Sequence, residues 1–178
     1  MTFQEELKKL NACSAAVEWV GNKTENEAWD TCKRGDWMLW LINARNPQVT
    51  LAVRKRLVLC SCDIAETVLK HVPKDEKRPA EAIRLARAWA QGEKVTIDEV
   101  KNAANAAYAA ANVAANAVAA ADAAYVVYAA YAAAYAAYAA ANAANAVAYA
   151  AWANAVYANA DAANAADIVR KYFKTWEG

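Results

Sequence analysis

Apolar side chains recur every three or four residues through the first half of the chain, in short segments separated by turn residues. This spacing places them on one face of an α-helix. Thr-x-x-Glu sequences that begin at Thr2, Thr24 and Thr96 have the form of capping boxes, which mark helix starts. Glycine and proline mark the ends of the segments. The pattern predicts no strands, and it predicts helices near residues 3–20, 25–34, 37–45, 50–71 and 79–91.

The second half is rich in alanine, and its polar positions form a stripe that changes phase twice. The changes fall near Asp122 and Asp161, a residue type suited to capping a helix. Three further helices are therefore expected, near residues 97–120, 123–158 and 161–176.

These elements predict an all-α fold. We expect an antiparallel multi-helix bundle of about eight helices, with long, close-packed Ala-rich helices in the C-terminal half. Residues 1–95 form a charged, Trp-rich helical bundle, and residues 96–178 form the Ala-rich segment. The short connections favour packing of the two parts on one another as a single domain.

Large side chains of the Ala-rich part form a Tyr/Asn seam, in which the steps alternate between three and four residues. Its members are Tyr128, Tyr131, Tyr135, Tyr138, Asn142, Asn145, Tyr149 and Trp152. A repeat of about 3.5 residues is typical of a face that meets another helix. Turned inward, the seam would bury aromatic rings and pair tyrosine hydroxyls with Asn amides. We favour an inward structural seam, while a pocket wall, an exposed surface and a subunit interface remain open.

Composition narrows the classes of function. The formal net charge of +1 argues against bulk nucleic-acid binding, which is typical of proteins with a basic stripe. The Ala-rich half is almost free of charge, but alanine is only weakly apolar and asparagine recurs throughout it, so no membrane span is expected. The N-terminus lacks the apolar core of a signal peptide. The four cysteines and one histidine have no zinc-site spacing. We expect reduced, buried thiols in a cytoplasmic protein, with no metal and no cofactor.

Two clusters of the first half are candidates for binding a ligand or partner. Gly35 is expected to end one helix and Asp36 to cap the next, on which Trp37 and Trp40 share a face as core anchors or as a stacking site. Asp63 and Glu66 lie three residues apart in an otherwise apolar helix. Pairing with an arginine of the next helix is the favoured interpretation, and a ligand-facing carboxylate is the alternative.

Basic residues form a third cluster. Arg78, Arg84 and Arg87 are expected close to Trp89, where they could contribute to a binding site. The run from Arg54 to Arg56 and the one from Lys74 to Arg78 are expected on solvated faces, with anion binding as the alternative.

The segments CSAAVEW, GDWMLWL, CDIAE and RPAEAIRLARAWAQGE, followed by an Ala-rich tail, resemble a family of small immunity proteins of bacteria, prophages and phages. The resemblance covers about residues 10–110 and extends loosely into the tail. It implies a role in toxin conflict without defining a molecular activity. The corresponding positions are Asp36, Trp37, Trp40, Asp63, Glu66, Arg78, Pro79 and Trp89.

Motifs for a serine nucleophile, a phosphate-binding loop or a catalytic metal do not occur, so we expect no enzyme. With the resemblance, the favoured function is neutralisation of a toxin or immune effector protein by binding, which predicts an exposed Trp or Tyr patch ringed by charge. The alternative is a phage anti-defence protein that sequesters a nucleotide signal, which predicts a concave pocket lined by aromatic, Asn and Arg side chains. A self-associating helical scaffold, and hence a homo-oligomer, is a further alternative.

Overall fold

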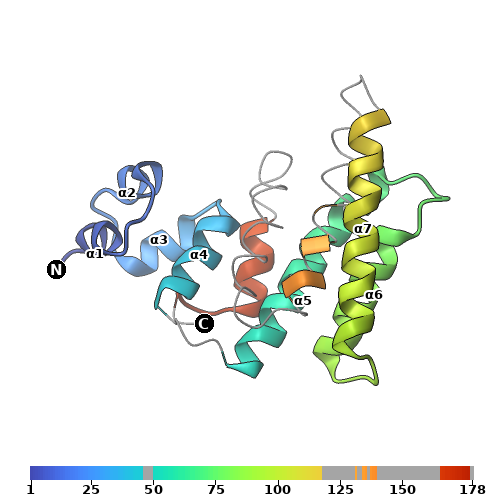
Figure 1. The fold of residues 1–178 in the computed structure, drawn as a ribbon. Coiled ribbons are helices and arrows are strands. Elements are labelled where there is room, and N and C mark those ends of the chain that lie inside the picture. The colour runs from blue at the N-terminus through green and yellow to red at the C-terminus, as the bar shows by residue number, and fades with distance from the viewer. Residues whose placement is uncertain (46–49, 118–130, 132–133, 136, 140–164, 177–178) are drawn as a thin grey trace.

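The computed structural model describes residues 1–45, 50–117, 131, 134, 135, 137–139 and 165–176. All regular structure in these residues is helical, which confirms the all-α prediction. Figure 1 shows the short helices α1–α4 at one end of the molecule and helices α6 and α7 at the other. Helix α5 and a C-terminal helix of residues 165–172 lie between these two ends (Figure 1).

The prediction of one helix over residues 3–20 is wrong, because this stretch forms helices α1 (Phe3–Lys9) and α2 (Ser14–Val20). Asn11 lies between them with a φ of 60°, a left-handed conformation that asparagine adopts more readily than most residues. Leu7 and Val20 are both buried in the core. Both helices turn apolar side chains toward the same core, and the spacing of these side chains in the sequence resembles that of one continuous helix.

Helices α3 (Glu25–Thr31) and α4 (Gly35–Arg45) follow. Gly35 begins α4 instead of ending a helix, and Asp36 lies in the first turn of α4, so the predicted roles of both residues are wrong. The carboxylate of Asp36 accepts two hydrogen bonds from Arg34, at 2.8 and 2.6 Å. A bidentate pair with an arginine two residues away uses both carboxylate oxygens, and this explains why the side chain does not cap the helix.

Helix α5 (Leu51–Val68) continues into a 3-10 turn, η1 (Leu69–His71), and is followed by α6 (Arg78–Gln91) and α7 (Ile97–Ala117). Gly92 ends α6 with a φ of 86°, the left-handed conformation expected at a helix end. Helix α6 packs against both α5 and α7 (Figure 1). None of the helices in the described ranges combines the length and apolarity needed to cross a bilayer.

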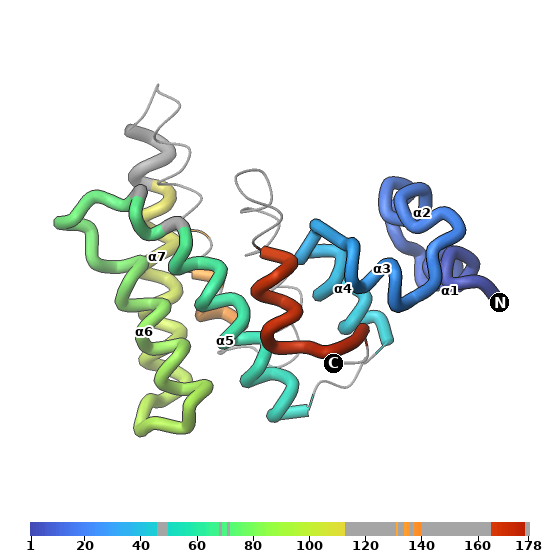
Figure 2. Tube along the Cα trace, turned by 180° about the vertical axis from the view of Figure 1, so that it is seen from behind, coloured from blue at the N-terminus to red at the C-terminus, as the bar shows by residue number. Residues whose placement is uncertain are grey.

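The C-terminal segment packs against helices from the opposite end of the chain. The guanidinium of Arg170 donates hydrogen bonds to the carbonyl oxygens of Trp29 and Cys32, where α3 ends and the helix dipole favours a cation. The indole of Trp176 donates to the carbonyl of Glu25 at 3.0 Å. Figure 2 shows this segment passing beside α4 and α5. The main hydrophobic core thus includes residues from both predicted parts of the chain.

The described part of the Tyr/Asn seam pairs with α7. The hydroxyl of Tyr131 donates to the amide oxygen of Asn112 at 2.8 Å, and that of Tyr138 donates to Asn105 at 2.6 Å. From the first pair to the second, the tyrosine position advances along the chain while the asparagine position goes back by the same number of residues. This segment therefore runs antiparallel to α7. The ring of Tyr131 also meets that of Tyr108 edge-on, with centroids 5.1 Å apart.

The tyrosines of this pairing lie at the rim of the helix contact instead of in the core. Tyr131, Tyr135 and Tyr138 are half-buried, whereas Ala134 and Ala137 between them are fully buried. Small alanine side chains allow neighbouring helices to approach closely, which leaves the larger rings at the edge. The seam is therefore an intramolecular contact over these residues. Tyr128, Asn142 and Asn145 lie outside the described residues.

We expect the Tyr131–Asn112 pair to contribute a coupling energy of about 0.5–1 kcal/mol, the usual net value of a neutral hydrogen bond. Urea unfolding of Tyr131→Phe, Asn112→Ala and the double variant measures this coupling. Asn102 is an exposed asparagine on the same helix, and Asn102→Ala combined with Tyr131→Phe serves as the control, for which additive effects are expected. Additive effects in the Asn112 cycle would contradict the pairing.

Candidate functional site

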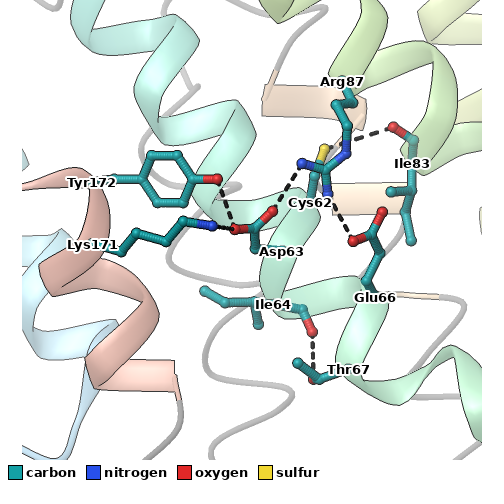
Figure 3. A network of polar contacts seen from close by, with 9 residues as sticks. All are labelled: Cys62, Asp63, Ile64, Glu66, Thr67, Ile83, Arg87, Lys171 and Tyr172. Atoms are coloured by element: carbon teal, nitrogen blue, oxygen red, sulfur yellow. Dashed lines mark hydrogen bonds and ion pairs between the residues drawn. The ribbon is translucent and has the colours of Figure 1, made fainter.

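A polar network centred on Asp63 joins three helices. Asp63 on α5 accepts a hydrogen bond from Arg87 of α6 at 2.8 Å. Its other carboxylate oxygen accepts hydrogen bonds from the Lys171 ammonium at 2.6 Å and the Tyr172 hydroxyl at 2.7 Å, both on the C-terminal helix. Figure 3 shows all three donors converging on this one carboxylate. The network therefore connects residues that are more than a hundred positions apart in the sequence.

The arginine of this network also reaches Glu66. One terminal nitrogen of Arg87 lies 2.9 Å from the Glu66 carboxylate (Figure 3). This nitrogen is buried and has no partner with hydrogen-bond geometry, so the Glu66 contact is an ion pair only. The expected pairing of Asp63 and Glu66 with an arginine of the next helix is confirmed, and that arginine is Arg87.

The environment of Asp63 keeps its carboxyl group ionised. Burial raises its pKa, but hydrogen bonds from Lys171, Tyr172 and Arg87 together outweigh burial and place the pKa below its usual range. Burial and the hydrogen bond to Asp63 raise the pKa of Tyr172 to about 12. A carboxylate with a lowered pKa and three donors is a weak general base, and a tyrosine with a raised pKa is a weak acid near neutral pH. The network is suited to bracing three helices rather than to proton transfer.

A second group of side chains forms a Trp-rich surface on α2 and α4, which we call the Trp19/Trp37 face. The two half-buried indoles meet with ring centroids 6.0 Å apart. Lys23 lies 4.7 Å from the ring centroid of Trp19, and the guanidinium of Arg34 lies 4.8 Å from that of Trp37. Each indole therefore carries a cation on its face, a favourable contact for an aromatic ring.

Two depressions border the Trp19/Trp37 face, and Trp19 lines both of them. The first is a small apolar cleft of about 20 Å³, open to solvent and lined by Trp37, Trp40 and Trp176 among others. The second is a shallow basin of about 520 Å³ between α2 and α3, with polar residues including Glu18 on its wall. A partly exposed aromatic surface ringed by charged side chains has the composition of a protein-binding hot spot.

The structure brings only some of the candidate residues together. Trp37 and Trp40 share the apolar cleft, with Asp36 close by through its pair with Arg34. Asp63 belongs to the separate network on α5.

The basic cluster around Trp89 differs from the expectation. Arg78 and Arg84 are exposed and pair locally with Glu76 and Glu81. Arg54 of α5 stacks over Trp89, with its guanidinium 4.8 Å from the ring centroid.

The sequence did not single out Trp19 as part of a site, nor the two C-terminal partners of Asp63. Trp19 lies within the segment CSAAVEW, but a single tryptophan in a short helix gives no local sign that a second one lies beside it. Lys171 and Tyr172 lie among the apolar residues Val169, Phe173 and Trp176, whose helical spacing favours packing of the last helix on the core. A pattern of this kind does not identify which carboxylate the polar members will meet.

The model of the Imm-5 like putative immunity protein family matches residues 48–174. The matched region is shifted relative to the expected one, since it begins after Trp40 and runs through the Ala-rich tail. It contains the whole Asp63 network, whereas Trp19 and Trp37 precede it.

Searches of curated proteins and of solved structures returned no match. The family match covers well over half of the chain. The resemblance seen in the sequence is confirmed, and the chain belongs to the Imm-5 like putative immunity protein family.

Proposed function

We propose that this protein acts in the cytoplasm of a bacterial or phage conflict system and neutralises a toxin or immune effector protein by binding it, without catalysis. The observation that carries the proposal is the family match over residues 48–174. An immunity-type role requires a stable scaffold and an exposed surface that recognises the partner. The Asp63 network braces three helices, as a stable scaffold requires, and the Trp19/Trp37 face has the composition of a recognition surface.

The chemistry of the described residues supports binding over catalysis. Both carboxylate oxygens of Asp63 accept hydrogen bonds, from three donors in all, and this makes Asp63 a weak base. Burial raises the pKa of the Cys60 and Cys62 thiols, that of Cys62 to about 12, which disfavours the thiolate form that acts as a nucleophile.

Nucleotide sequestration is the weaker alternative. The apolar cleft has no charged lining residue to hold a phosphate, and its volume of about 20 Å³ is far below that of typical small-molecule pockets. The larger basin carries the carboxylates of Glu18 and Glu27 against a single ammonium, from Lys23. This balance of charge disfavours an anionic ligand.

The direct test uses the product of the reading frame beside the gene. We expect co-expression with this protein to restore growth to cells that produce the neighbouring protein, and the two chains to elute together in size-exclusion chromatography as a stoichiometric complex. Growth should recover only as the amount of immunity protein reaches that of its partner.

Rescue far below equal amounts would indicate catalysis and contradict the proposal. Failure to form a complex, together with nucleotides released from the denatured protein and identified by mass spectrometry, would favour the alternative.

A further inference from the structure

The two depressions on the Trp19/Trp37 face form a composite surface, because Trp19 lines both an apolar cleft and a basin with excess negative charge. We propose that this surface is the docking site for a partner segment that presents an apolar side chain next to a lysine or arginine. The inference deepens the proposed function, on which it rests, by naming the surface and the chemistry of the partner.

The apolar cleft supplies the anchor position. Its walls come from α1, α2, α4 and the C-terminal segment, and include Phe3, Trp19, Trp37, Trp40, Leu41 and Trp176. The three tryptophans of α2 and α4 are only half-buried, so their rings remain partly in contact with solvent. The cleft itself, at about 20 Å³, is too small to admit a side chain. An apolar side chain laid across its mouth would cover the exposed parts of these rings, and removing apolar surface from water favours binding.

The basin supplies the electrostatic position. Glu18 and Glu27 are exposed on its wall, and hydrogen bonds from the backbone and hydroxyl of Thr24 lower the pKa of Glu27. Glu18 is exposed to a cation in the basin, and Glu27, although one of its oxygens accepts hydrogen bonds from Thr24, adds a second negative charge. Lys23 balances one of these charges, but its ammonium is held by the carbonyl oxygen of Trp19 at 2.6 Å. The basin keeps a net negative charge, which complements a basic segment and not an acidic one.

The position of Lys23 also shows that a cation fits against this ring. Its ammonium lies 4.7 Å from the Trp19 centroid. A partner's lysine or arginine could occupy the basin near the same ring and gain a similar contact together with the two carboxylates.

This surface lies outside the region matched by the family model. Apart from Trp176, its lining residues precede the region matched by the family model, which begins at residue 48. Helices α1–α4 also lie at the end of the molecule opposite α6 and α7 (Figures 1 and 2). A partner bound to this face would therefore leave the α6–α7 end uncovered.

A phage-displayed library of short random peptides, selected on the immobilised full-length protein, tests the proposal. We expect enriched peptides to pair an apolar residue with a nearby lysine or arginine. The variant Glu18→Lys should weaken binding of these peptides by about tenfold or more, which corresponds to about 1.4 kcal/mol. Asp75→Lys makes the same charge change at an exposed loop residue after α5 and should leave binding unchanged.

Circular dichroism melts of both variants establish that they are folded, and Trp37→Ala gives a second measure that should weaken the same peptides. Enrichment of acidic or uncharged peptides, no enrichment at all, or equal binding to the wild type and Glu18→Lys would overturn the proposal. The outcome is separate from that for the proposed function. A growth-restoring complex unaffected by Glu18→Lys would refute this surface and leave neutralisation intact.

Discussion

Replacing Phe173 with alanine should lower the free energy of unfolding by about 3–5 kcal/mol, the range observed for truncating a buried aromatic side chain. Phe173 has no exposed surface and is the largest of the fully buried side chains in the described residues. It follows the C-terminal helix directly, and the guanidinium of Arg56 lies 5.1 Å from its ring centroid. The substitution would leave a cavity where the last segment of the chain closes the core.

Urea unfolding followed by circular dichroism measures this loss. Phe173→Leu retains most of the buried volume and should cost less than half as much as the alanine variant. Leu51→Ala serves as the control, because Leu51 is 59% exposed and its truncation should change stability by about 0.5 kcal/mol or less. A loss below about 1 kcal/mol for Phe173→Ala would show that the C-terminal segment is not an integral part of the core.

Local signals in the sequence predicted most helix starts correctly. The hydroxyl oxygens of Thr2, Thr24 and Thr96 each accept a hydrogen bond from the backbone N–H of the glutamate three residues later. The carboxylate of that glutamate accepts one from the backbone N–H of the threonine. Such caps depend on residues within one turn, so the pattern alone is sufficient. The break at Asn11 was missed because asparagine does not require the left-handed conformation and the apolar spacing continues across it.

Contacts between distant segments could not be predicted in the same way. Arg54 and Arg56 belong to a run expected on a solvated face, yet their guanidinium groups stack on Trp89 and Phe173. Long arginine side chains can cover apolar surface while their charge stays near water, so the charge of a run does not determine its burial. The pairing of Asp63 with an arginine was predictable from its apolar helix, but the donors from Lys171 and Tyr172 depend on how the last helix docks.

The position of Asp63 between α5, α6 and the C-terminal helix explains why it should be sensitive to substitution. Asp63→Ala should lower the free energy of unfolding by about 2–4 kcal/mol, because it leaves the partly buried guanidinium of Arg87 without its principal acceptor. The exposed fraction of the Asp63 side chain is 15%, whereas that of Lys171 is 64%, so most of the loss should come from the arginine side. Glu66 also pairs with Arg87 and serves as the control. Its side chain is half exposed, so Glu66→Ala should lower the free energy of unfolding by less than Asp63→Ala.

The pH dependence distinguishes loss of this charge from loss of packing. The folded-state pKa of Asp63 lies below its ordinary value of 3.8, so its ionised form contributes stability above that pH. As the pH falls below 3.8 and through the folded-state pKa, the contribution disappears. The stability difference between the wild type and Asp63→Asn should therefore be constant from neutral pH down to about pH 5 and shrink in more acidic solution.

Tyr172 provides the complementary test in alkaline solution. Its pKa rises from 10.0 to about 12 in the folded protein, so its neutral hydroxyl contributes stability that is complete below pH 10 and is lost as the pH approaches 12. The advantage of the wild type over Tyr172→Phe should decrease across that window, measured by urea unfolding at fixed pH. If both differences stayed constant at every pH, the Asp63 network would act through shape alone, and the hydrogen bonds to its carboxylate would not hold the C-terminal helix in place.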